Sequence, residues 1–272
     1  MILVTGANGN LGSATLAALR ARGATAMGGS RTPGAGMRRL DFDDPSGIDL
    51  VGVSTLVLVS AGYAEDDQVI GRHAAVLDAA ARDEVRHVVY TSLTGAGDHL
   101  GFALAHRATE RLVRAHDVPW TILRNGLYAE LFGGLLMWAD TGIESAFGDG
   151  ALAAVARADL AEAAAVIAAD PARHRGRSYE LVGTPITAAD VAGRLAVPHR
   201  SIGLGDYRRR LHRTPGLLPF QPPMLASIAT AVRHGFLDGT GPDLAAILGR
   251  PVHDPLTVAA ATASAAAPAA VR

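Results

Sequence analysis

The sequence contains no cysteine, and all 25 of its basic side chains are arginine because no lysine occurs. The lack of cysteine excludes disulfides, thiolate nucleophiles and cysteine-based metal sites. The lack of lysine excludes Schiff-base chemistry, a phosphate-loop lysine and a Tyr-Lys proton relay. No His-x-x-x-His motif with a neighbouring carboxylate occurs among the ten histidines, so we expect no metal site.

Charge and hydropathy are those of an ordinary globular chain. The 26 acidic and 25 basic residues give a net charge of -1, which supplies no electrostatic footprint for nucleic acid. No apolar run reaches about 18 residues, so we expect no membrane span. Met1–Val4 leads straight into a glycine loop without the features of a secretion signal. We therefore expect a cytoplasmic monomer or homodimer whose partner is a small molecule.

The first 125 residues alternate short apolar runs with amphipathic stretches. The predicted strands are 2–5, 25–29, 38–41, 55–60, 87–92 and 121–124, and the predicted helices are 11–21, 68–82 and 103–116. Alternating strands and helices, with strands that are almost wholly apolar, predict an α/β fold whose parallel sheet is covered on both faces.

The pattern changes after Asn125. We predict helices at 128–139, 158–169 (capped by Asp159) and 187–195 (opened by a capping box of Thr187 and Asp190), and a strand at 178–182. The prolines of 215–223 indicate an irregular loop near the site. The predicted division is a dinucleotide-binding core at 1–127, a mixed region at 128–256 that completes the core and forms a small substrate-binding part, and an alanine-rich tail at 257–272.

The strongest local signal is a glycine-rich loop between the first strand and the first helix. Gly6 permits the tight turn, Gly9 lets the backbone approach a pyrophosphate, and Gly12 allows close packing of helix on sheet. The helix amino terminus then offers N–H groups to the phosphates. The predicted cofactor contacts in this loop are Gly6, Asn8, Gly9, Asn10 and Leu11. The alternative is a glycine-rich turn with no ligand.

The end of the second strand indicates which dinucleotide is preferred. An NAD site usually places a carboxylate there, whereas this chain has Gly28–Thr32 with Arg31, which suits the 2′-phosphate of NADP(H). A solvated loop arginine is the alternative. Asp41 could accept a hydrogen bond from the adenine amino group and Phe42 could pack beside the ring, although a structural turn explains Asp41 equally well.

Small residues follow the fourth strand. Ser60, Ala61 and Gly62 would let backbone and hydroxyl groups reach the ribose side of the cofactor at the carboxyl ends of the strands. This assignment rests on position, because small polar residues are common in any loop between a strand and a helix.

Several longer motifs make the chain resemble a known family. Thr5–Gly12 resembles the NmrA-like atypical short-chain dehydrogenase/reductases, while Tyr90–Leu93, His106–Glu110 and Thr121–Tyr128 are most similar to the NADPH-dependent quinone oxidoreductase 2 branch. Gly148–Gly150, Ala156–Ala161 and Ser178–Leu181 extend the similarity. The resemblance implies a Rossmann-like doubly wound core, a smaller carboxyl-terminal part, NADPH as cofactor and a quinone or similar aromatic substrate.

The chain departs from typical short-chain dehydrogenases at the catalytic motif. Phe102 and His106 occupy the places of the usual Tyr and Lys, and only Ser92 of the usual trio remains. Ketone reduction needs a positioned acid, whereas a quinone delocalises the negative charge that hydride brings. Quinone reduction therefore agrees with the resemblance and tolerates the missing phenol.

Four residues could assist at the reacting end. His106 could donate to the nicotinamide ribose or to the substrate, since imidazole titrates near neutrality. Ser92 could hydrogen-bond the substrate oxygen. Asn125 could bind the nicotinamide side or orient a water, and Tyr128 could line the acceptor pocket. For His106 and Tyr128, ordinary structural roles remain open.

Three functions remain possible. The first is an NADPH-dependent oxidoreductase that transfers hydride to a quinone or similar conjugated acceptor. The second is a non-catalytic NADP(H)-binding sensor or regulator, because NmrA-like proteins include regulators that lack the Tyr and Lys. The third is a biosynthetic ketoreductase or isomerase on the same scaffold.

Overall fold

A seven-stranded sheet forms the centre of the larger part of the molecule, and every neighbouring pair of its strands is parallel. The computed structural model describes residues 1–61 and 64–268. The strands are β1 (Ile2–Val4), β2 (Ala26–Ser30), β3 (Met37–Arg39), β4 (Thr55–Val59), β5 (His87–Leu93), β6 (Trp120–Asn125) and β10 (Arg177–Leu181). Their order is β10-β6-β5-β4-β1-β2-β3. The order reverses between β1 and β4, which confirms the predicted doubly wound sheet.

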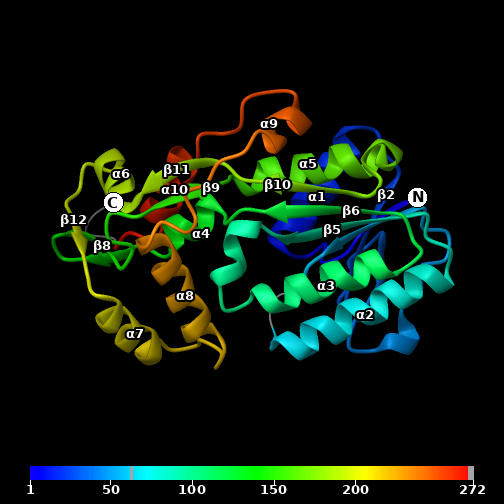
Figure 1. The fold of residues 1–272 in the computed structure, drawn as a ribbon, viewed down its shortest axis with the longest axis horizontal. Helices are drawn as coiled ribbons and strands as arrows, with labels where there is room; N and C mark the ends of the chain where they lie inside the picture. Colours follow the sequence, from blue (N-terminus) through cyan, green and yellow to red (C-terminus); the bar gives the residue numbers. More distant parts are fainter. Residues whose placement is uncertain (62–63, 269–272) are drawn as a thin grey trace.

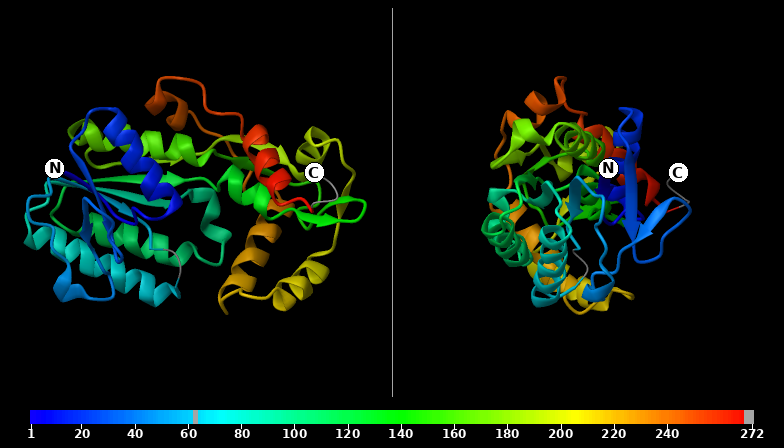
Figure 2. Two further views of the ribbon diagram at one scale, coloured as in Figure 1. Left: turned by 180° about the vertical axis from the view of Figure 1, so that it is seen from behind. Right: turned by 90° about the vertical axis from the view of Figure 1, so that its right-hand side faces the viewer.

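Helices cover both faces of this sheet (Figure 1, Figure 2). The helices α1 (Asn10–Ala21) and α5 (Arg157–Ala169) lie on one face, and α2 (Asp66–Arg82) and α3 (Ala103–Ala115) lie on the other. Neighbouring residues of β1 show why, because Val4 packs with the first pair of helices and Leu3 with the second. Both side chains are fully buried. Strands with two buried faces need the continuous apolar runs that the sequence has.

A smaller part lies at the other end of the long axis (Figure 1). Its helices are α4 (Ala129–Gly134), α6 (Ala188–Arg194), α7 (Leu204–Arg213), α8 (Gln221–Arg233) and α10 (Pro255–Ala265). Its strands are β7 (Met137–Ala139), β8 (Gly142–Ser145), β9 (Ala151–Ala154), β11 (Thr184–Thr187) and β12 (His199–Ser201). The remaining elements of the described chain are α9 (Asp243–Leu248), η1 (Pro45–Gly47), η2 (Gly95–His99) and η3 (Pro171–His174). No helix of the described residues has the length and apolar character needed to cross a bilayer.

Two predicted elements end at least two residues earlier than expected. The helix predicted at 128–139 stops at Gly134, because paired glycines are weak helix formers and Met137–Ala139 instead pairs antiparallel with β8. The third strand ends at Arg39, so Asp41 lies beyond it.

The helix termini give one confirmation and two corrections. Thr187 and Asp190 form the predicted capping box of α6. Asp159 lies inside the first turn of α5 and does not cap it, and its buried carboxylate accepts hydrogen bonds from Arg250 and His253. The loop predicted at 215–223 ends before Gln221, where α8 begins with prolines in its first turn, a position that proline tolerates.

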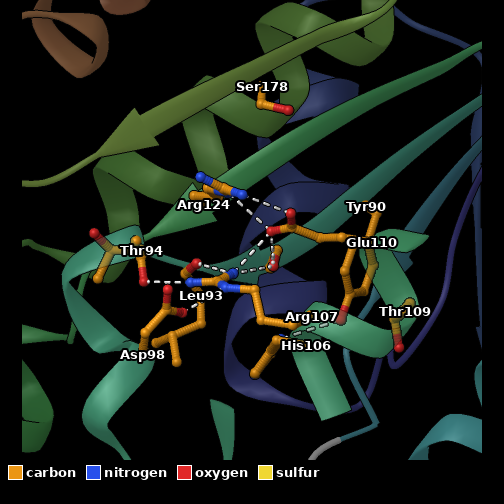
Figure 3. Close-up of polar contacts among 12 residues, drawn as sticks. Tyr90, Leu93, Thr94, Asp98, His106, Arg107, Thr109, Glu110, Arg124 and Ser178 are labelled. Carbon is orange, nitrogen blue, oxygen red and sulfur yellow. Dashed lines mark hydrogen bonds and ion pairs between the residues drawn. The ribbon is translucent and has the colours of Figure 1, made fainter. Parts of the chain in front are cut away.

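A buried carboxylate ties α3 to the sheet (Figure 3). Glu110 is 1% exposed and accepts hydrogen bonds from Arg124 of β6 at 2.7 and 2.9 Å, from Arg107 at 2.9 Å and from the Ser92 hydroxyl at 2.7 Å. Arg124 also reaches Glu180 of β10 at 3.1 Å. Burial alone would raise the pKa of Glu110, but these hydrogen bonds and charges lower it to about 2.

Replacing Glu110 with Gln should lower the free energy of unfolding at neutral pH by about 3 kcal/mol, because clustered guanidinium groups lose their carboxylate. The folded pKa lies below the ordinary 4.5, so this contribution is complete above pH 4.5 and is lost as the pH falls toward 2. Urea denaturation at a series of pH values should show the two proteins converging in acid. Asp170→Asn, which breaks an exposed pair with Arg173, should change stability by less than about 0.5 kcal/mol; equal losses in both variants would contradict this assignment.

Candidate active site

A cavity of about 790 Å³ lies at the carboxyl ends of the parallel strands, and its volume is in the range of small-molecule and cofactor sites. The loop between β1 and α1, the ends of β2, β4, β5 and β6, and the amino end of α5 all contribute to its lining. Helix α8 adds Met224 and Ile228 from the smaller part. The cavity thus occupies the place where a doubly wound sheet binds ligands.

The glycine loop forms a backbone cradle on one wall of the cavity. Gly6 has φ +60°, which favours glycine, and the Gly9 N–H donates to the Gly6 carbonyl at 2.8 Å. A Cβ at position 12 would lie 2.7 Å from the Gly6 carbonyl carbon, so only glycine lets α1 pack this closely. No described side chain caps α1. The N–H groups of its first turn, which belong to residues that line the cavity, therefore remain available as hydrogen-bond donors.

Asn8 braces this loop against the end of β2. Its side-chain amide donates to the Ser30 hydroxyl at 2.9 Å and to the Thr32 carbonyl at 2.8 Å. Arg31 lies between these two partners, is exposed, and lines the cavity together with Asn10 and Leu11 of the predicted set. Asn8 therefore holds the arginine segment beside the glycine cradle, a bracing role that its place in the motif did not reveal.

Of the two residues predicted to contact the adenine, Phe42 lines the cavity and Asp41 does not. Asp41 accepts a hydrogen bond from the Asp43 backbone at 3.2 Å and lies 3.7 Å from Arg39, so the turn given as the alternative describes it. Nearby Asp43 does line the cavity, and it binds Arg72 of α2 through two contacts of 2.6 and 2.8 Å. Arg72 lowers the pKa of Asp43. Spacing along the chain could not pair residues on a loop and on a later helix.

The loop after β4 reaches the cavity through Ser60 and Ala61, which the sequence predicts to lie on the ribose side of a cofactor. The Ser60 N–H donates to the Thr91 hydroxyl at 3.1 Å, and the Ala61 N–H donates to Nε2 of the buried His73 at 3.0 Å. Gly62, the third residue of this predicted group, lies outside the described residues. The backbone of Ser60 and Ala61 is therefore held by side chains of β5 and α2.

Ser92 lines the cavity, but its proton is engaged elsewhere. Its hydroxyl donates to Glu110 at 2.7 Å and is 4% exposed. A serine that already donates to a buried carboxylate has no second proton for a substrate oxygen. The predicted donor role of Ser92 thus has no support in the structure, and the residue anchors the network around Glu110 instead.

His106 projects from α3 into the cavity lining and is held by Tyr90 (Figure 3). The Tyr90 hydroxyl lies 3.1 Å from Nδ1, and Nε2 makes no hydrogen bond with the described residues. Burial, together with the charge of Arg107, lowers the pKa of His106 to about 4. The imidazole is therefore neutral at pH 7, which corrects the expectation that it titrates near neutrality.

Asn125 and Tyr128 also line the cavity, at and just beyond the end of β6. Asn125 is 6% exposed, and its Oδ1 is buried with no hydrogen-bond partner among the described residues. A buried acceptor without a partner costs free energy that a ligand donor would recover. Burial raises the pKa of Tyr128, whose ring carries the Arg157 guanidinium 5.0 Å from its centroid. Arg157 lies in a motif that marked the family resemblance, which was the only sequence signal for it.

Apolar side chains form one wall of the cavity, and one of them, Phe102, lies beside His106. The members of this wall come from the residue before α3, from the segment after β6 and from α8: Phe102, Leu127, Leu131, Met224 and Ile228. Phe132 of α4 is not part of this wall, because its ring stacks on Phe147 in the core with centroids 4.9 Å apart. The contribution of α8 could not be predicted, because it depends on how the smaller part packs against the carboxyl ends of the strands.

The cavity suits an elongated ligand with an anionic middle and a flat end. Glycine at positions 6 and 12 lets α1 begin directly beside the turn, which leaves its first N–H groups for an anion, and the free Oδ1 of Asn125 fits an amide donor. These observations fit the dinucleotide that the sequence predicts. No group of three or more metal-ligating side chains occurs in the described part of the chain.

Comparison with known proteins gives a consistent picture. No protein-family model matches the chain. It is 30% identical over 277 residues to quinone oxidoreductase 2 of Escherichia coli, covering 92% of this chain and 94% of that protein. Citrobacter sp. triphenylmethane reductase in complex with NADP(H) superposes with a TM-score of 0.85 at 28% identity, over 96% of this chain and 99% of that one. The NADPH complex of the E. coli quinone oxidoreductase gives 0.84 at 28% identity, with the same coverage.

Proposed function

Because the chain belongs to the quinone oxidoreductase 2 branch of the NmrA-like short-chain dehydrogenase/reductases, we propose that it is an NADPH-dependent oxidoreductase that reduces a quinone or a similar conjugated acceptor. One observation carries the proposal: a single cavity runs from the glycine cradle and Arg31 to His106 and an apolar wall. Cofactor and acceptor can therefore meet inside it. The acceptor is a small aromatic molecule, and the proposed compartment is the cytoplasm.

Different residues along the cavity would bind different parts of the cofactor. The N–H groups at the start of α1 bind the pyrophosphate, and Arg31 binds the 2′-phosphate with a charge-assisted contact. Phe42 packs at the adenine end, and the backbone of Ser60 and Ala61 borders the ribose of the nicotinamide half. Asn125 accepts a hydrogen bond from the carboxamide with its unpartnered Oδ1. When bound, NADPH supplies the hydride.

At the reacting end, the chain offers weak donors and an apolar surface. With Ser92 engaged by Glu110, the groups left for the acceptor oxygen are Nε2 of His106 and the Tyr128 hydroxyl. Both are neutral at pH 7, because burial lowers the pKa of His106 and raises the pKa of Tyr128. Neutral donors can stabilise charge that an aromatic ring already delocalises, whereas a simple ketone needs a stronger acid.

The same features explain why the usual motif is dispensable. Phe102 lines the cavity where a catalytic phenol would stand, and its ring lies edge-on to His106 with centroids 6.3 Å apart. It adds flat apolar area beside the imidazole. Orientation of a flat acceptor against the cofactor then supplies most of the rate enhancement.

The purified protein should oxidise NADPH rapidly with simple quinones and only weakly with aliphatic ketones, because its donors are neutral. Loss of NADPH absorbance across a matched panel of quinones and ketones measures this directly. Replacing His106 with Ala should lower kcat for quinones by about 10²-fold. Tight NADPH binding with no turnover of any acceptor would instead favour the sensor, and faster ketone reduction would favour the ketoreductase.

Replacing Arg31 with Ala should raise the Kd for NADPH about thirtyfold, the equivalent of about 2 kcal/mol, and leave the Kd for NADH within about twofold. Only NADPH carries the 2′-phosphate that the guanidinium would bind. Calorimetric titration of both cofactors measures the two constants. Arg20→Ala removes the same charge from an exposed position at the end of α1 and serves as the control. Equal weakening of both cofactors by Arg31→Ala would refute the assignment.

A further inference from the structure

His106 is the one predicted catalytic residue whose ring is held by a fully buried partner. Tyr90 of β5 is 0% exposed, and its hydroxyl lies 3.1 Å from Nδ1 of His106 (Figure 3). We propose that Tyr90 is a positioning residue: its hydroxyl donates to Nδ1 of His106, keeps the imidazole proton on Nε2 and presents that N–H to the acceptor. The role of this N–H toward an acceptor rests on the proposed function, whereas the proton's position does not.

The direction of the hydrogen bonds behind Tyr90 follows from a backbone group that can only donate. The Ala61 N–H donates to Nε2 of His73 at 3.0 Å, so that nitrogen carries no proton. Burial lowers the pKa of His73 to about 3, and its single proton therefore resides on Nδ1. Nδ1 lies 2.8 Å from the Thr109 hydroxyl oxygen and donates to it.

Thr109 then has no proton left for Tyr90. Its hydroxyl, having accepted from His73, donates to the Ala105 carbonyl at 2.8 Å. Thr109 also lies beside the Tyr90 hydroxyl, as does Ser60. The Tyr90 proton thus has two kinds of acceptor within reach: the hydroxyl oxygens and the imidazole nitrogen of His106.

The imidazole nitrogen is the stronger acceptor of the two kinds. A phenol is a better proton donor than an alcohol, and an unprotonated imidazole nitrogen is far more basic than a hydroxyl oxygen. Burial raises the pKa of Tyr90, so the phenol keeps its proton across the working range. An O–H···N bond from Tyr90 to Nδ1 is therefore favoured over the reverse arrangement.

This arrangement determines what His106 can do. With Nδ1 accepting, the neutral ring carries its proton on Nε2, at the opposite edge, where no described residue binds it. Nε2–H can then donate a hydrogen bond to the acceptor oxygen on which negative charge develops, without giving up the proton.

The test uses Tyr90→Phe, which removes the hydroxyl and retains the ring. In the ligand-free wild type, long-range ¹H–¹⁵N spectra of the imidazoles, assigned with His106→Ala, should show His106 protonated at Nε2 alone. In Tyr90→Phe the two tautomers should be mixed. With a quinone, kcat should fall about tenfold while KM changes less than about twofold, because the bond strengthens as charge develops.

Tyr207→Phe removes a buried tyrosine hydroxyl from α7, outside the cavity lining, and should change neither measurement. A wild-type His106 protonated at Nδ1 would overturn the proposal, as would Tyr90→Phe with an unaltered tautomer. The wild-type spectrum decides the matter even if Tyr90→Phe does not fold. If no quinone is turned over, the proposed function fails, yet the spectra still settle the proton's position.

Discussion

The close approach of α1 to the turn that precedes it is the constraint on which the site depends. A side chain at position 12 would collide with the carbonyl of Gly6, so two residues without side chains bring the helix amino terminus to the carboxyl edge of the sheet. The donors of α1 then point into the cavity, and Asn8 ties the same loop to the segment that carries Arg31. In the proposed binding mode, a dinucleotide would extend from there along the strand ends toward β6.

Burial explains the chemistry at the far end of the cavity. It lowers the pKa of both His73 and His106, and it raises the pKa of Tyr90 and Tyr128, so these four side chains are neutral at pH 7. The charged groups of Arg107 and Arg124 are paired with Glu110, which also accepts a hydrogen bond from Ser92. An active site of this kind can orient and polarise an acceptor, but it is poor at delivering a proton. This property matches quinone reduction.

Much of the core, and the wall of the cavity that the glycine loop forms, could be predicted from the sequence, because both depend on local patterns. Apolar runs defined the strands, and three spaced glycines defined the cradle, whose predicted residues all line the cavity. The pairing of Asp43 with Arg72 could not be predicted, since it joins a loop to a distant helix. The engagement of Ser92 was likewise hidden, because a motif gives a residue's position but not the direction of its proton. Arg124, part of the Thr121–Tyr128 motif that resembles the branch, binds Glu110 and Glu180, so this motif stabilises the fold as well as contributing to the site.

The most direct test of the central claim is calorimetric titration of NADPH into the wild type, Gly12→Ala and Gly71→Ala. A Cβ at position 12 would lie 2.7 Å from the Gly6 carbonyl carbon and must displace α1, whereas one at position 71 of α2 meets no atom within 4 Å. The account predicts one NADPH bound per wild-type chain, the same affinity for Gly71→Ala, and affinity at least about 100-fold weaker for a folded Gly12→Ala. Wild-type affinity in Gly12→Ala, or no heat of binding in the wild type, would contradict it.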